Sequence, residues 1–167
     1  MIVLSNTARA WAAYANVVRN PRFFPLWLGQ LVSNLGDTLN YIALVIIVFR
    51  ITGSGTALAL VSIFQIVPVI TVSLVAGVVI DRVSRKVIMV GADVVRGLLV
   101  LLLIVADQTN QVVLVYVAAT LLAAVGSFFR PALQAIIPSL LDEDELLAAN
   151  SVAWSTEQLV QIVGAAV

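Results

Sequence analysis

Long apolar segments alternate with short polar loops along this chain. Four segments, at residues 23–49, 57–80, 87–106 and 112–129, are each long enough to cross a bilayer, which takes about 20 residues of helix. A fifth apolar run, 146–167, reaches the last residue without a polar flank, and we expect a spanning helix to continue beyond it. The segments are too long for barrel strands and lack their alternating pattern. The pattern predicts an all-α membrane protein with four complete transmembrane helices and most of a fifth.

The composition agrees with a chain whose solvent is lipid. Hydrophobic residues make up 62% of the chain and charged residues 11%, whereas soluble domains are about half apolar and a quarter charged. The absence of Cys and His excludes disulfides, thiolate zinc sites and catalysis by thiol or imidazole. With a formal net charge of zero, we expect no nucleic-acid partner. We also expect no metal, no cofactor and no enzymatic activity.

The distribution of Lys and Arg predicts the orientation in the membrane. The basic residues before the first span are Arg9, Arg19 and Arg22, those after the second are Arg82, Arg85 and Lys86, and Arg130 closes the fourth. Only Arg50 follows the first span and none follows the third. Because cytoplasmic loops carry the excess of basic residues, we expect a multi-pass protein of the cell (inner or plasma) membrane with a cytoplasmic lead-in at 1–22. Pro131, after Arg130, is expected to stop the fourth helix.

Polar residues form one stripe along the first span. At about 100° per residue, one arc of the helix holds Gln30, Ser33, Asn34, Asp37 and Thr38. Asp37 is mid-span, where a charge is costly and is normally turned toward the protein interior. The stripe therefore indicates a substrate or proton pathway through Gln30, Asn34 and Asp37. A structural seam of hydrogen bonds between helices is the alternative.

The second and third spans carry fewer polar residues. Gln65 shares a face with Ser62 and Ser73 and fits either a pathway or ordinary hydrogen bonding between helices. In the third span, Asp93 and Arg96 are three residues apart, a spacing that allows a buried ion pair. That pair could be structural or could belong to gating, and Arg96 is a further candidate for the pathway.

The most specific stretch is Gly-Val-Val-Ile-Asp-Arg-Val-Ser-Arg-Lys, residues 77–86, between the second and third spans. Gly77 permits a close approach of backbones. Asp81 can pair with Arg85 or face the end of another helix. Arg82, Arg85 and Lys86 can hold the turn at the anionic inner surface of the membrane.

This stretch resembles the signature loop of the major facilitator superfamily, Gly-x-Leu-Ala-Asp-Arg-x-Gly-Arg-Lys. Val79 stands where the family usually has Leu, and Ser84 where it often has Gly, a residue that favours left-handed turns. Other stretches are similar to the macrolide-efflux and enterobactin-exporter branch: Gly29–Asp37, Ala92–Gly97, Pro131–Pro138 and Ala149–Ser151.

The resemblance implies the N-terminal part of a major-facilitator six-helix bundle, one of two such halves. It implies proton-coupled efflux of small amphipathic compounds (a drug, a macrolide or a siderophore) by alternating access. The expected partners are the lipid bilayer, the substrate, protons and a C-terminal half that this chain lacks. Residues 77–86 would form a conformational latch between the halves, and Asp37 would face the central cavity. The alternative is a non-transporting scaffold or assembly protein, or an inactive truncated remnant.

Overall fold

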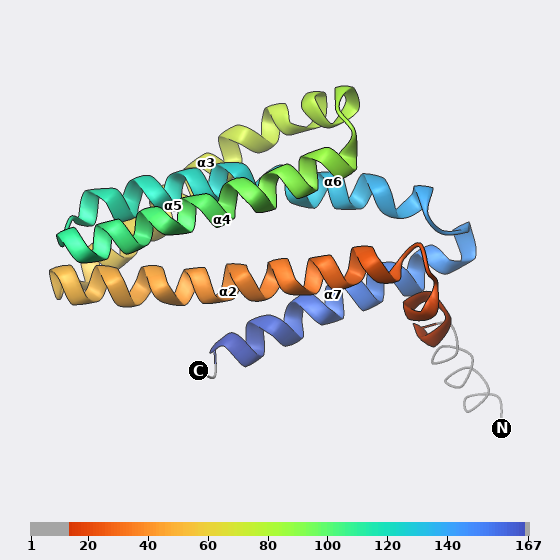
Figure 1. Ribbon diagram of the computed structural model, residues 1–167, viewed down its shortest axis with the longest axis horizontal. Coiled ribbons are helices and arrows are strands. Elements are labelled where there is room, and N and C mark those ends of the chain that lie inside the picture. The colour runs from red at the N-terminus through yellow and green to blue at the C-terminus, as the bar shows by residue number, and fades with distance from the viewer. Residues whose placement is uncertain (1–13, 166–167) are drawn as a thin grey trace. The chain divides into compact units, whose positions relative to one another are not determined.

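The computed structural model describes residues 14–165, and this part of the chain is helical with short turns and no strand (Figure 1). After a helical stretch at 14–19, its helices are α2 (Phe24–Thr52), α3 (Gly55–Arg82), α4 (Arg85–Thr109), α5 (Val112–Gly126), α6 (Phe129–Ile136), the 3₁₀ turn η1 (Ile137–Ser139) and α7 (Glu143–Ala165). Two compact units are present. The first unit joins the residues up to Leu39 with those from Ile136, and the second is Asn40–Ala135. Part of the predicted lead-in, 1–13, and residues 166–167 of the predicted fifth span lie outside the described residues.

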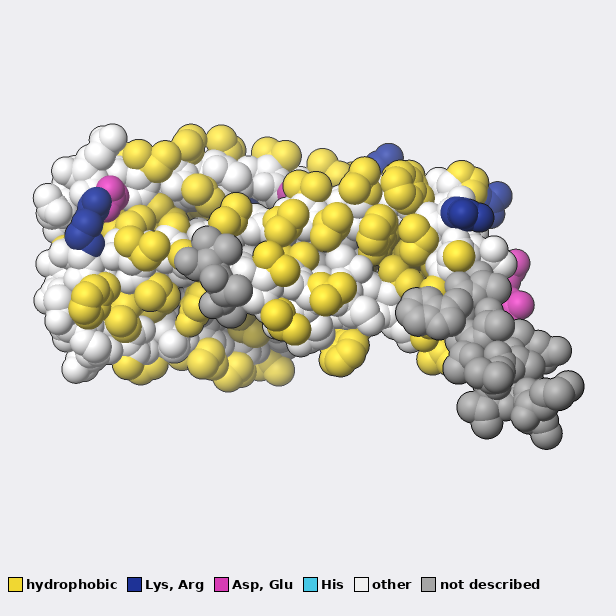
Figure 2. All heavy atoms as spheres, turned by 90° about the horizontal axis from the view of Figure 1, so that it is seen from below, with side chains coloured by type: hydrophobic (Ala, Val, Ile, Leu, Met, Phe, Trp, Pro, Cys, Tyr) yellow, Lys and Arg dark blue, Asp and Glu magenta, His cyan; other side chains and the backbone are white. Residues whose placement is uncertain are grey.

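Four described helical stretches are long and apolar enough to cross a membrane: Phe23–Thr52, Gly55–Arg82, Arg85–Thr109 and Val112–Ser139. They confirm the prediction of an all-α membrane protein. Exposed hydrophobic side chains cover much of the face shown in Figure 2, as expected where lipid replaces water. The described part of α7 is not among these four stretches, so a fifth span at 146–167 stays a prediction.

The core of the second unit forms where α5 packs against both α3 and α4. Its buried members are Leu44, Val48, Ala57, Val61, Leu103, Ala106, Val115, Ala118, Ala119 and Leu122. Ala118 and Ala119 have no exposed surface, and such small residues let helix backbones approach closely in lipid. Tyr116 stacks on Phe64 with ring centroids 4.8 Å apart, and its hydroxyl donates to the Ala57 carbonyl oxygen at 3.2 Å.

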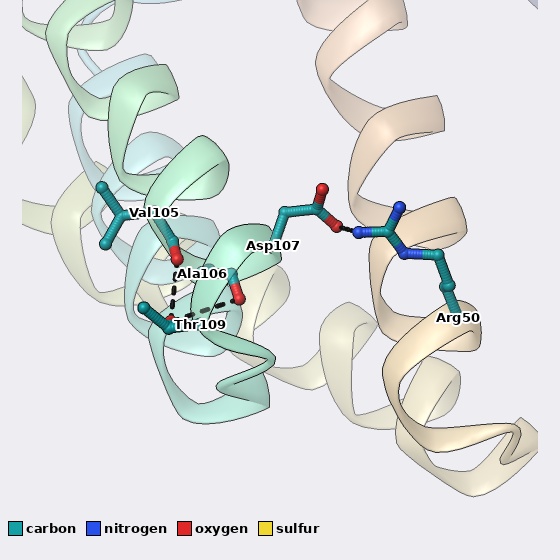
Figure 3. A network of polar contacts seen from close by, with 5 residues as sticks. All are labelled: Arg50, Val105, Ala106, Asp107 and Thr109. Atoms are coloured by element: carbon teal, nitrogen blue, oxygen red, sulfur yellow. Dashed lines mark hydrogen bonds and ion pairs between the residues drawn. The ribbon is translucent and has the colours of Figure 1, made fainter.

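An ion pair between Arg50 and Asp107 joins the end of α2 to the end of α4 (Figure 3). Beside it, the Thr109 hydroxyl donates to the Val105 carbonyl oxygen at 2.8 Å. Asn110 then closes α4 in a left-handed conformation with φ 52°, which Asn adopts more readily than most residues. The C-terminal ends of the first and third predicted spans therefore lie together, as they must when each helix is antiparallel to the next one along the chain.

The fourth span differs from the sequence-based prediction at its end. The chain turns after Gly126, where α5 ends, and α6 begins at Phe129, so the break comes before Pro131 rather than at it. The Ser127 hydroxyl donates to the Ala123 carbonyl oxygen at 2.8 Å within this break. Pro131 lies in the first turn of α6, where a backbone N–H has no helical partner and its absence costs little.

In the first unit, α7 packs along the first half of α2. The Trp27 indole N–H donates to the Thr156 hydroxyl at 3.0 Å. Further along, Gly164 lies so close to Thr38 that a Cβ at position 164 would overlap the Thr38 methyl group. The second contact lies C-terminal to the first in both helices. The two helices therefore run parallel, as Figure 1 shows.

Candidate transport site

The charged turn between α3 and α4 consists of only two residues outside the helices. Val83 and Ser84 connect α3, which ends at Arg82, to α4, which begins at Arg85. Ser84 has φ −55° and ψ 123°, so this position needs no left-handed conformation and accepts Ser without strain. Nothing in the described chain lies within 4 Å of where a Gly77 Cβ would stand, so the close approach expected there is not made among these residues.

Within this turn, Arg85 is held by its own unit. Its Nη1 donates to the Ala135 carbonyl oxygen on α6 at 2.7 Å, which ties the start of α4 to the end of α6. The alternative pairing of Arg85 with Asp81 is not formed in the described structure. Residues 81–86 are exposed, so the charges of Asp81, Arg82 and Lys86 are presented at one end of this helix pair.

The pair predicted in the third span is present but is only half buried. Arg96 Nη1 lies 3.4 Å from Asp93 Oδ1, with 14% of the Arg96 side chain exposed and 43% of that of Asp93. Gly126 of α5 lies beside the guanidinium, since a Cβ there would stand 3.9 Å from Arg96 Nε, at ordinary van der Waals distance. The arginine is thus packed into the bundle, while the aspartate reaches its surface.

The polar stripe of α2 combines a buried amide with an exposed carboxylate. Gln30 is 6% exposed, whereas Asp37 is exposed. Asn34 is half-buried, and its buried Nδ2 has no hydrogen-bond partner, while its carbonyl oxygen accepts from the Thr38 hydroxyl at 3.0 Å. These four residues belong to the first unit, whereas the half-buried Gln65 lies on α3 in the second.

Two polar features were missed by the sequence analysis. Glu157 lies in α7, half-buried, in the same unit as Asp37. Its signal was an ionisable residue inside the fifth apolar run, followed four residues later by Gln161. The Arg50–Asp107 pair had no such signal, because it depends on which helix ends meet in space.

Comparison with known proteins identifies the family. The family model described as transmembrane secretion effector, one of the major facilitator models, matches residues 10–167. The chain belongs to the major facilitator superfamily. Its membership confirms that the chain resembles this superfamily as a whole.

Several curated relatives belong to the same superfamily. Macrolide efflux protein A of Streptococcus pyogenes is 30% identical over 148 residues, covering 87% of this chain and 36% of that protein. The MFS-type transporters YfiS and YkuC of Bacillus subtilis (strain 168) are 29% identical over 142 residues and 27% over 135. These two matches cover 84% and 80% of this chain, and 33% and 31% of the relatives. The chain thus spans about a third of the length of these relatives, and no solved structure matches it.

Proposed function

We propose that this chain forms the N-terminal part of a secondary active transporter that exports small amphipathic compounds by alternating access. Protons moving into the cell drive the export, and the protein lies in the cell membrane with its N-terminus in the cytoplasm. Family membership and the similarity to a macrolide efflux protein over 87% of the chain support this function.

The observation that carries the proposal is the carboxylate of Asp37 within α2. A charge inside a span costs at least a few kcal/mol, so the position needs a compensating role. A structural seam of hydrogen bonds is the alternative, and Asp37 is exposed among the described residues. An exposed carboxylate in a spanning helix can take up and release a proton, and Gln30 and Asn34 can hydrogen-bond substrate or water beside it.

The turn at 77–86 supports the conformational part of the mechanism. With Arg85 bonded to Ala135, the turn is fixed to its own bundle, and Asp81 is left to face a helix end of the second half. This interaction stabilises the state that is closed to the cytoplasm. Breaking it on each cycle opens the pathway inward.

Transport by the complete protein in lipid vesicles tests the proposal. Vesicles with an imposed pH gradient receive a labelled macrolide, and energised accumulation is measured for the wild type, Asp37→Asn and the control Asp144→Asn. Asp144 is exposed in the first turn of α7, so this control removes an equal charge away from the α2 stripe. We expect Asp37→Asn to abolish accumulation or change its pH dependence, and Asp144→Asn to resemble the wild type.

Two results would contradict this expectation. If Asp37→Asn transports normally across the pH range, the stripe of α2 is a structural seam. If the wild type moves neither a macrolide, a hydrophobic dye nor a siderophore under any gradient, the protein is a non-transporting membrane component.

A further inference from the structure

A second polar stripe runs along α7, in the same unit as the first half of α2. Asn150, Trp154, Glu157 and Gln161 follow one another at intervals of four, three and four residues, which places them on one side of the helix. Trp154 is 65% exposed, Gln161 is also exposed, and Glu157 is half-buried. The proposed transport mechanism uses none of these four residues.

The printed contacts fix the register of α7 against α2. Thr156 lies beside Trp27, and Gly164 lies beside Thr38. Residues 157–163 therefore run alongside residues 28–37. Two carboxylates of this unit, Glu157 and Asp37, fall inside or at the edge of this stretch.

The handedness of the helices places these carboxylates on the same side of the pair. Glu157 is about 100° forward of Thr156 around α7, and Asp37 is about 100° back from Thr38 around α2. In two parallel right-handed helices that face each other, forward rotation on one and backward rotation on the other lead to the same side. Since Thr156 and Thr38 lie in the contact, Glu157 and Asp37 both border it on that side.

Gln30 lies on the Asp37 side of α2 and Gln161 on the Glu157 side of α7 by the same reasoning. The α2–α7 polar face is defined here as Gln30, Asp37, Glu157 and Gln161. Trp154, three residues before Glu157, lies at its rim. Two carboxylates, two amides and an indole thus lie on one side of two packed helices, with the Gln30 amide buried.

The spacing of the carboxylates decides what this face can bind. Glu157 lies at the level of Thr156 and Asp37 at that of Gly164, so about 10 Å of helix rise separates their levels. A metal ion needs oxygen ligands within about 2–2.6 Å, so the two carboxylates cannot share one. An amphipathic organic cation can pair with one carboxylate, place its apolar body along the helices and contact the indole through its charge.

We propose that the α2–α7 polar face binds an amphipathic organic cation, such as a quaternary or protonated amine, with Glu157 as its ion-pairing group and Trp154 as its aromatic contact. This inference rests on the proposed function, since it names the substrate class of the exporter. Glu157 is then a specificity residue on α7, separate in role from Asp37, which handles the proton.

Equilibrium binding by the complete protein in lipid nanodiscs tests this assignment without transport. The probe is radiolabelled tetraphenylphosphonium, a permanent organic cation, and uncharged triphenylphosphine oxide serves as the neutral competitor. The variants are Glu157→Gln, Glu157→Asp and the control Asp144→Asn. We expect Glu157→Gln to raise the Kd for the cation about tenfold, the equivalent of about 1.4 kcal/mol, and the other two variants to stay near the wild type. The inhibition constant of the neutral competitor should not change.

The assignment is overturned if the wild type shows no saturable binding of the cation, or if Glu157→Gln binds it as tightly as the wild type. Equal weakening for the cation and the neutral compound also overturns it, since a structural seam predicts that result. Should Glu157→Gln fail to fold, Trp154→Ala and Trp154→Phe replace it, with the cation weakened only in the alanine variant. Cation binding through Glu157 without efflux in vesicles would refute the proposed function alone, whereas efflux that is indifferent to Glu157 would refute this inference alone.

Discussion

Replacing Gly164 with Ala tests how closely α7 packs against α2. A Cβ at this position would overlap the Thr38 methyl group and would stand 3.3 Å from Thr38 Cβ. Overpacking of this kind costs about 1–3 kcal/mol. The higher helix propensity of Ala returns at most about 1 kcal/mol, so we expect a net loss of stability of up to about 2 kcal/mol.

The companion change Thr38→Ser makes the test specific. Serine lacks the methyl group that a new Cβ would meet, and it keeps the hydroxyl that donates to the Asn34 carbonyl oxygen. The double variant should therefore recover most of the stability lost in Gly164→Ala, with a coupling energy of about 1–2 kcal/mol. Gly97→Ala on α4 is the control, since nothing lies within 4 Å of its Cβ position, and it should be neutral or slightly stabilising.

The measurement is reversible unfolding of the complete protein in detergent, compared over the four members of this double-mutant cycle. Equal stability of Gly164→Ala and the wild type would show that the helices do not meet at this point. If Gly164→Ala lowers the stability equally with Thr and with Ser at position 38, the cost does not come from overlap with the Thr38 methyl group.

Three further predictions concern the turns. A Cys in place of Ser84 should react with membrane-impermeant thiol reagents only from the cytoplasmic side and one in place of Gln108 only from outside; the reverse pattern would overturn the orientation. Asp81→Asn should make cysteines introduced into the transport cavity more accessible from the cytoplasm and should lower turnover, while substrate binding survives. The reason is that a latch worth about 1–3 kcal/mol shifts the equilibrium between the two conformational states roughly 5–150-fold. Unchanged accessibility and turnover would show that the turn is only a charged loop. For Arg50 and Asp107, a double-mutant cycle measured by unfolding should give a coupling energy of up to about 1 kcal/mol, the range of exposed ion pairs. Exchanging the two residues should recover part of the lost stability. The absence of coupling at low salt would show that the pair does not contribute to stability.

Apolar length predicted the long helices well because it is a property of local sequence. The second span was expected at 57–80 and α3 runs from Gly55 to Arg82, longer because Ser54 caps its start and polar residues at its end continue the helix. The end of the fourth span was predicted less well. The break after Gly126 falls inside an apolar run, and hydropathy carries no information about a turn that Ser127 helps to make.

In the candidate site, too, contacts within one helix could be predicted from the sequence and contacts between helices could not. The contact of Asp93 with Arg96 follows from a spacing of three residues in a helix, so the sequence contained it. The contact of Arg85 with Ala135 and the register of α7 against α2 depend on tertiary packing, which no local pattern encodes. Glu157 had a local signal, an ionisable residue in an apolar run, but its side of α7 relative to α2 becomes visible only once Thr156 and Gly164 are placed.

The Arg50–Asp107 pair has a consequence for biosynthesis. During synthesis α2, with Arg50 at its end, is made two helices before Asp107. In the proposed orientation, this arginine must cross the membrane while its partner does not yet exist, and an unpaired positive charge opposes that crossing. The basic residues of the lead-in therefore have to hold the first helix in its orientation until α4 is inserted. The ion pair then forms in a topology that is already fixed.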